Sequence, residues 1–139
     1  MNIDYNGFLI SDDQKLIQPD RAYELLSDTY WADSRSRESV EKSIQNSLCF
    51  GIYKDGLLIG FARCVTDYAV MYWLGDVIID GKYRGLGLGK ALIKVVTEHE
   101  KLANLIGFLG TRDAHGLYEQ FGFQRDQGSS MRKGPNTEK

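Results

Sequence analysis

A glycine-rich turn that leads into an amphipathic helix carries the clearest chemical signal of this sequence. The turn lies in the run Asp76-Val-Ile-Ile-Asp-Gly-Lys-Tyr-Arg-Gly-Leu-Gly-Leu-Gly-Lys-Ala-Leu92. Glycines before a helix let several backbone N–H groups point at one place, where the helix dipole also favours negative charge. The run therefore predicts a phosphate or diphosphate site. The residues expected around it are Arg84, Gly85, Leu86, Gly87, Leu88, Gly89 and Lys90.

The spacing of these residues distinguishes between three nucleotide-binding motifs. A Walker P-loop has the pattern G-x-x-x-x-G-K-[S/T], but Arg84 stands at its first glycine and Ala91 at its hydroxyl position. A dinucleotide fingerprint has the pattern G-x-G-x-x-G, and counting from Gly85 its third glycine falls on Lys90. The pattern that fits is R-x-x-G-x-G, which begins at Arg84.

That pattern, followed by a helix, resembles the acetyl-CoA-binding loop of the GCN5-related N-acetyltransferase (GNAT) superfamily. The later segment Thr111–Phe123 resembles the closing block of the family, N-x-x-A-x-x-L-Y-x-x-x-G-F. Its matching positions are Ala114, Leu117, Tyr118, Gly122 and Phe123. It differs at Thr111, where the family has an asparagine that contacts the pantetheine arm. The resemblance covers roughly residues 48–125.

The resemblance implies an α+β fold with a mixed, mostly antiparallel central sheet flanked by helices. In this family a splayed pair of parallel strands holds the cofactor, acetyl-CoA. By position, the backbone of Val77, Ile78 and Ile79 would face the acetyl and pantetheine groups. Thr111 and the helix carrying His115 and Tyr118 would complete the cofactor contacts.

Two residues suit the proton transfers of acetyl transfer to an amine. Tyr118 lies in the last predicted helix, where the family keeps a tyrosine near the sulfur, and its phenol would protonate the departing thiolate. Asp76 is a lone carboxylate beside Gly75, a residue that could mark a β-bulge. It is the candidate base for an ammonium whose pKa is about 10. The alternative is that Asp76 only satisfies backbone amides of a bulge.

The amine acceptor would enter from the side formed by the first two predicted helices and the strand loops. Aromatic side chains together with a carboxylate could bind a cation there. The candidates for this wall are Tyr30, Trp31, Asp33, Arg35, Tyr68, Tyr72 and Trp73. The alternative is that the same residues only pack helix against sheet.

Two functions of different classes fit these motifs. The first is an N-acetyltransferase that moves acetyl from acetyl-CoA to a primary amine of a small molecule or peptide by direct attack. The second is a non-catalytic acyl-CoA-binding or sensing module. Both predict cofactor binding, and release of the coenzyme A thiol in the presence of an amine separates them.

Composition narrows the class of protein further. A chain of 139 residues with 42% apolar residues predicts one globular domain over residues 1–139. A net charge of −2 gives no broad attraction to nucleic acid or to an anionic membrane. Cys49 and Cys64 fall in predicted strands without metal-ligand spacing, so we expect reduced core thiols and no metal site.

The N-terminal residues lack the basic and apolar regions of a secretory signal, which favours a cytoplasmic protein. The oligomeric state stays open, a homodimer included. The acyl-chain preference and the identity of the acceptor amine also stay open.

Hydrophobic periodicity and turn residues give the order of the elements that must position these groups. The predicted strands are 8–11, 49–54, 57–66, 70–79 and a buried strand at 105–110, with a possible final strand after residue 129. The predicted helices are 19 to about 30, 36–47, 88–102 and 114–121. Residues 134–139 are predicted to form a disordered tail.

Overall fold

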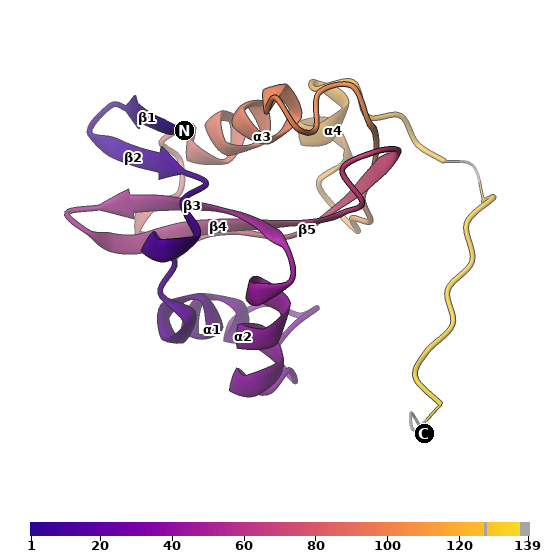
Figure 1. Ribbon diagram of the computed structural model, residues 1–139, viewed down its shortest axis with the longest axis horizontal. Helices are drawn as coiled ribbons and strands as arrows, with labels where there is room; N and C mark the ends of the chain where they lie inside the picture. Colours follow the sequence, from indigo (N-terminus) through magenta and orange to yellow (C-terminus); the bar gives the residue numbers. More distant parts are fainter. Residues whose placement is uncertain (127, 137–139) are drawn as a thin grey trace.

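The computed structural model describes residues 1–126 and 128–136. Six strands form one sheet in sequence order, with helices on both faces (Figure 1). The strands are β1 (Asn2–Tyr5), β2 (Phe8–Ser11), β3 (Leu48–Lys54), β4 (Leu57–Thr66), β5 (Met71–Ile79) and β6 (Ile106–Phe108). The helices are α1 (Pro19–Ser27), α2 (Arg37–Gln45), α3 (Leu88–Glu98) and α4 (His115–Glu119), with short 3-10 turns η1 (Gln14–Leu16) and η2 (Gly81–Tyr83).

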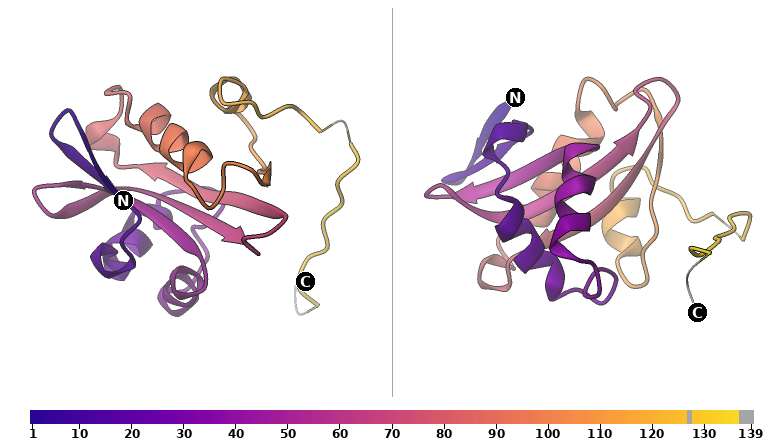
Figure 2. Two further views of the ribbon diagram at one scale, coloured as in Figure 1. Left: turned by 45° about the horizontal axis from the view of Figure 1, so that its top comes forward. Right: turned by 60° about the horizontal axis from the view of Figure 1, so that its bottom comes forward.

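Neighbouring strands are antiparallel except β5 and β6, which run parallel. The helices α1 and α2 cover one face of the sheet, while α3 and α4 lie on the other (Figure 2). The parallel pair follows from the crossover through α3, since parallel neighbours need a long connection. The predicted mixed, mostly antiparallel sheet is confirmed.

Two tight turns set the strand register. Asn6-Gly7 and Asp55-Gly56 both have positive φ at each central residue, at 50° and 88° and at 49° and 83°. This conformation matches the twist of a hairpin, which is why Asn-Gly and Asp-Gly favour it. The second turn falls between the strands predicted at 49–54 and 57–66, as expected. The strand β1 was not predicted, although Asn6-Gly7 is the signal that could have revealed it.

The first helix ends earlier than predicted, at Ser27 instead of about Tyr30. The Thr29 hydroxyl donates to the Leu26 carbonyl at 2.7 Å and accepts from the Ala32 amide at 3.1 Å. These side-chain bonds compete with helical ones, as threonine commonly does. They turn the chain so that Tyr30 and the residue after it leave the helix.

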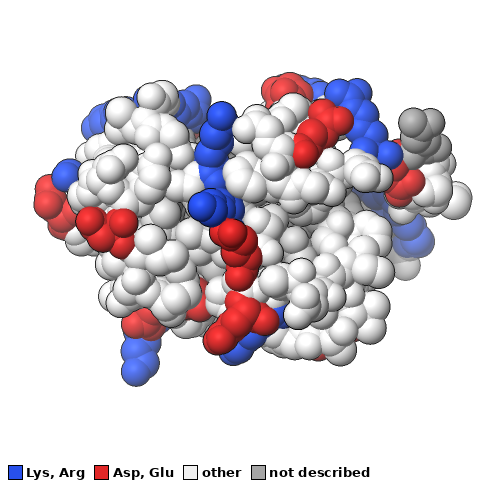
Figure 3. Space-filling model, turned by 90° about the horizontal axis from the view of Figure 1, so that it is seen from above, with Lys and Arg blue, Asp and Glu red and all other residues white. Residues whose placement is uncertain are grey.

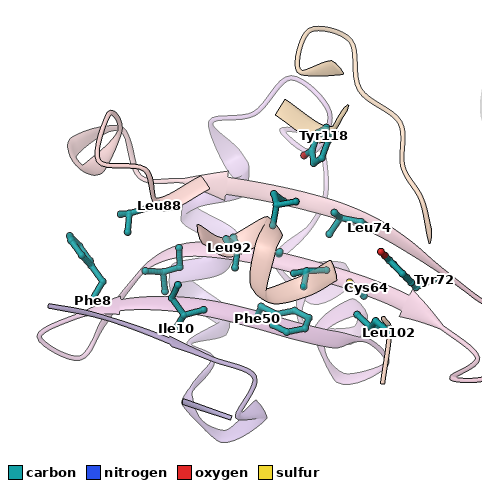
Figure 4. Close-up of a cluster of buried hydrophobic side chains, with 14 of the residues drawn as sticks. Phe8, Ile10, Phe50, Cys64, Tyr72, Leu74, Leu88, Leu92, Leu102 and Tyr118 are labelled. Carbon is teal, nitrogen blue, oxygen red and sulfur yellow. The ribbon is translucent and has the colours of Figure 1, made fainter. Parts of the chain in front are cut away.

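Two apolar clusters form the core, one on each face of the sheet. The larger cluster lies between α3 and the sheet (Figure 4) and includes Phe50, Leu92 and Tyr118. The smaller lies under α1 and α2. Successive residues of a strand face opposite sides, so the two clusters share the strands β3 and β4.

Cys49 and Cys64 are both buried free thiols, as predicted for core residues. They lie on adjacent strands but belong to different clusters, and therefore face opposite sides of the sheet. Burial raises the pKa of each thiol to about 12.

The strand predicted at 105–110 is shorter and more exposed than expected. It spans Ile106–Phe108, and Ile106 is 59% exposed. The strand pairs with β5 on one side, and no described residue pairs with its other edge. The final strand predicted after residue 129 does not form in the described part, 128–136. Of the predicted tail 134–139, residues 137–139 lie outside the described residues.

Candidate active site

A cleft opens where β5 and β6 part. The two strands pair only from Met71 with Ile106 to Trp73 with Phe108, whereas β5 continues to Ile79. The cleft beyond this point has a volume of about 550 Å³. Its walls are the later part of β5, the glycine loop before α3, the start of α4 and the loop after α1. The splayed parallel pair expected from the resemblance is therefore present.

The glycine loop closes one end of this cleft. Gly85 and Gly87 have φ of +81° and +79°, and Gly87 is the N-cap of α3. A Cβ on Gly87 would also stand 2.9 Å from the Tyr5 hydroxyl. The first N–H groups of a helix have no acceptor within the helix. At this end the cleft therefore presents free donors and a helix dipole, which fit a diphosphate.

Most of the residues predicted to bind the cofactor line the cleft together. These are Val77, Ile78, Ile79, Arg84, Gly85, Gly87, Leu88, Gly89, Thr111 and Tyr118. Leu86 and Lys90 are exposed and lie outside the lining. His115 lines an adjoining hollow beside Phe123, which shares Trp73 and Thr111 with the cleft. The Arg84 side chain folds back onto β5, where its Nε donates to the Ile79 carbonyl at 3.2 Å.

Tyr118 is buried in α4 and still lines the cleft. Its ring packs edge-to-face on Phe123, with centroids 6.0 Å apart. Burial raises the pKa of the Tyr118 phenol above its ordinary value. The hydroxyl is therefore protonated at neutral pH, which is the state that a proton donor needs.

A β-bulge places Asp76. Arg63 of β4 pairs with Gly75, but Phe61 pairs with Ile78, so β5 carries one extra residue at this point. Asp76, not Gly75, takes the left-handed conformation, with φ of +56°. Before the bulge Tyr72 and Leu74 face α3, and after it Val77 and Ile79 do. The bulge thus turns Asp76 toward the α1 and α2 face.

The Asp76 carboxylate is held by two arginines. Arg35 Nη1 donates to both oxygens at 2.9 and 2.8 Å, and Arg63 Nε donates at 2.8 Å. The carboxylate is only 3% exposed. Burial by itself would raise its pKa, but the hydrogen bonds from the two arginines outweigh burial, so the pKa of Asp76 is lowered.

A buried carboxylate with a lowered pKa and two guanidinium partners is a poor proton acceptor. The geometry therefore argues against the predicted role of Asp76 as general base. It also differs from the alternative interpretation, because the carboxylate binds arginines and not the amides of the bulge. Its position suits a residue that orients the Arg35 side chain.

Four of the predicted acceptor-side residues line the cleft, namely Tyr30, Trp31, Arg35 and Trp73. Tyr30 and Trp31 pack edge-to-face with centroids 5.1 Å apart, and the Arg112 guanidinium lies 3.8 Å from the centre of the Tyr30 ring. The Trp73 ring lies against Gly110, whose Cβ would be 3.7 Å away.

Three other residues predicted for the acceptor wall do not line the cleft. Tyr72 is buried in the cluster under α3, because it alternates with Trp73 along β5. Tyr68 lies in the β4–β5 turn, under the Lys101 ammonium at 5.6 Å from the ring centre. Asp33 is exposed and does not line the cleft. Of the charged residues predicted for this wall, only Arg35 thus reaches the cleft.

Sequence reasoning missed two cationic residues of this region, Arg63 in the lining and Arg112 above Tyr30. Arg63 interrupts the apolar strand Leu57–Thr66, and a charge in such a strand is a signal for a buried partner. No comparable signal marks Arg112.

Comparison with known proteins identifies relatives along most of the chain. The profile of the Acetyltransferase (GNAT) family matches residues 19–123. A Xanthomonas campestris pv. campestris crystal structure assigned to the GNAT family is 38% identical, with a TM-score of 0.88 over 95% of this chain and 96% of that chain. A GNAT family acetyltransferase from Elizabethkingia anophelis, with acetyl-CoA bound, shares the fold at 16% identity, with a TM-score of 0.68 over 88% of this chain and 80% of that chain.

Curated relatives match over a shorter region. The spermine/spermidine N(1)-acetyltransferase of Bacillus subtilis is 34% identical over 87 residues, which is 53% of this chain and 57% of that protein. An uncharacterized N-acetyltransferase of Prochlorococcus marinus is 38% identical over 78 residues, which is 52% of this chain and 43% of that protein. The chain thus spans about half the length of these two relatives.

The described residues include neither a membrane-spanning helix nor a cluster of metal ligands. No helix among them is long and apolar enough to cross a membrane. Within the same residues, no three histidine, cysteine or acidic side chains are grouped to hold a metal ion.

The face that carries α3 and α4 is largely uncharged, with basic and acidic side chains interspersed (Figure 3).

Proposed function

Because this chain belongs to the acetyltransferase (GNAT) family, we propose that it is an acyl-CoA-dependent N-acetyltransferase. It transfers acetyl from acetyl-CoA to a primary amine of a small molecule or peptide by direct attack. The observation that carries this proposal is the continuous cleft from the glycine loop of α3, past Tyr118, to the aromatic wall at Trp73.

The two long walls of the cleft fit an extended thioester carrier. The amides around Gly87 and Gly89 would hold its diphosphate. Beyond Trp73, β5 has no partner strand on the side of β6 among the described residues, so its backbone edge is available to a pantetheine arm. Such an arm would hydrogen-bond as an added strand does. When bound, acetyl-CoA supplies an activated acyl group for attack by nitrogen.

Tyr118 is the proposed proton donor to the departing sulfur. The phenol is protonated at neutral pH and lines the same cleft as the edge of β5. A backbone amide of Val77, Ile78 or Ile79 would polarise the carbonyl, as an oxyanion site does without any special side chain. Asp76 is assigned to orienting Arg35 and not to accepting a proton.

The test begins with binding and then turns to turnover. Isothermal calorimetry of the purified chain with coenzyme A and acetyl-CoA should show saturable binding. Release of the coenzyme A thiol is then followed over amino acids, peptides, arylamines and polyamines. Polyamines belong in the panel because one relative is named for spermine and spermidine. Binding without release over the whole panel would contradict the enzyme and favour an acyl-CoA-binding module.

A further inference from the structure

The end of the cleft opposite the glycine loop is cationic. The lining contains Arg35 and Arg63 on a single carboxylate, that of Asp76. Two guanidinium groups against one carboxylate leave this cluster with a net positive charge. The Arg35 side chain is 33% exposed, so the excess charge reaches the cleft instead of being sealed in the core.

Both arginines keep unused hydrogen-bond donors. Arg35 binds Asp76 through Nη1 alone, and no acceptor in the part of the chain that the structure describes engages its Nη2 or Nε. Arg63 uses Nε for Asp76 and Nη1 for the Ser47 hydroxyl. A guanidinium presents its donors as a planar fork that matches a carboxylate or phosphate.

The backbone conformation of Asp76 indicates that the position of Arg35 matters. Residues other than glycine are uncommon in the left-handed region, and such residues gather at functional sites. The bulge turns the Asp76 carboxylate to the cleft side, where it holds a guanidinium that comes from 41 positions away in the chain. The result is a preoriented cation.

The aromatic wall is already occupied by a cation. The Arg112 guanidinium covers one face of the Tyr30 ring, which would otherwise attract a cationic ligand. Asp113 is the remaining carboxylate of the lining, and it is exposed at the rim by the start of α4. A polycationic acceptor would therefore meet three guanidinium groups around this wall, from Arg35, Arg63 and Arg112.

We propose that the acceptor is a primary amine that also carries an anionic group, a carboxylate or a phosphate, and that Arg35 binds this group. The inference rests on the proposed acetyl transfer and names the acceptor class for the same cleft. Arg35 thereby determines specificity, and Asp76 positions it.

The experiment compares matched acceptors that differ only in the anionic group. Amino acids are assayed beside their amides, aminoalkyl phosphates beside aminoalcohols, and polyamines form a third arm. We expect kcat/KM for the anionic member of a pair to exceed that of its neutral partner by about tenfold or more. The carboxylate and phosphate arms show which anion is used.

Arginine variants assign the effect to one side chain. In Arg35→Gln the preference for anionic acceptors should fall to near one, mainly through KM, and Arg35→Lys should restore part of it. Arg37→Gln is the matched control, because Arg37 of α2 pairs with Asp20 of α1 and with Glu41, and does not line the cleft. That variant should keep the full preference. Thermal unfolding checks that each variant is folded.

A binding measurement separates this inference from the proposed function. Calorimetry of each acceptor on protein saturated with coenzyme A should show tighter binding of anionic amines, with no turnover involved. If amides or polyamines react as well as amino acids, or if Arg35→Gln weakens charged and neutral acceptors equally, the inference is overturned while acetyl transfer stands. If coenzyme A itself does not bind, the proposed function fails first.

Discussion

The two ends of the cleft are built from different parts of the chain. At the α3 end, consecutive residues supply backbone N–H groups, and Gly87 makes their conformation possible. At the acceptor end, side chains from the loop after α1, from β4 and from β5 meet on Asp76. The first kind of site is fixed by local sequence, whereas the second depends on how distant segments pack.

This difference predicts that the two ends respond differently to substitution. Loss of a side chain at the acceptor end should lower stability or acceptor specificity and leave the affinity for the cofactor unchanged. Loss of a glycine at the α3 end should lower the affinity for the cofactor and spare the acceptor specificity.

The largest effect on stability is expected at Asp76. Asp76→Asn should lower the free energy of unfolding by about 3 kcal/mol, because removing one partner of a buried ion pair leaves the others uncompensated. Asparagine tolerates the left-handed backbone, so the change removes charge and little else. Urea denaturation measures the effect, and coenzyme A affinity should stay the same. The exposed cleft carboxylate offers a control, since Asp113→Asn should change stability by less than about 0.5 kcal/mol.

The largest effect on turnover is expected at Tyr118. Tyr118→Phe should lower kcat about tenfold or more, since a positioned proton donor is lost. The affinity for acetyl-CoA, measured by calorimetry, should stay within about twofold, because the ring still packs on Phe123. Full activity of this variant would remove Tyr118 from the mechanism.

A smaller effect is expected at Gly87, where the affinity for coenzyme A should change. Gly87→Ala should weaken coenzyme A binding by about tenfold, because alanine resists a φ of +79° and the loop must shift. Gly7→Ala is the control, since Gly7 has φ of +88° in the β1–β2 turn, away from the cleft. Both variants should lose similar stability, but only the first should lose affinity. Equal affinities would mean that the loop does not hold the diphosphate.

The smallest effect concerns pH. Because the pKa of Asp76 is lowered in the folded chain, its stabilisation is complete above the unfolded pKa of about 3.9 and is lost as pH falls through the folded value. The stability gap between wild type and Asp76→Asn should therefore be constant from pH 7 to about pH 5 and narrow below about pH 4. Urea midpoints along this series measure it. A gap that persists unchanged to pH 3 would show that the carboxylate charge is not its source.

The glycine loop before α3 and the order of the helices and strands could be predicted, because both are determined by residues close together in the sequence. The R-x-x-G-x-G spacing determines where the backbone can turn left-handed, and Asp55-Gly56 specifies its hairpin. The end of α1 was missed because the Thr29 hydroxyl competes with the helix for backbone partners.

The acceptor wall could be predicted only in part, and the orientation of Asp76 shows one reason, because one inserted residue reverses the facing of β5. Alternation alone would place Asp76 under α3 beside Leu74. Gly75 indicated that a bulge was possible, and the pairing with β4 shows that one forms. Contacts with distant segments also decide the exposure of β6, which was expected to be buried because its residues are apolar. Its exposure depends on whether another segment covers its outer edge, which no local pattern encodes.

The burial of the two cysteines makes the release of coenzyme A thiol straightforward to measure. A thiolate is the reactive form of cysteine, and Cys49 and Cys64 are buried with pKa values of about 12. A colorimetric disulfide reagent added to the native chain should find almost nothing to titrate. The colour that develops during an assay would then come from liberated coenzyme A, without subtraction of a protein background.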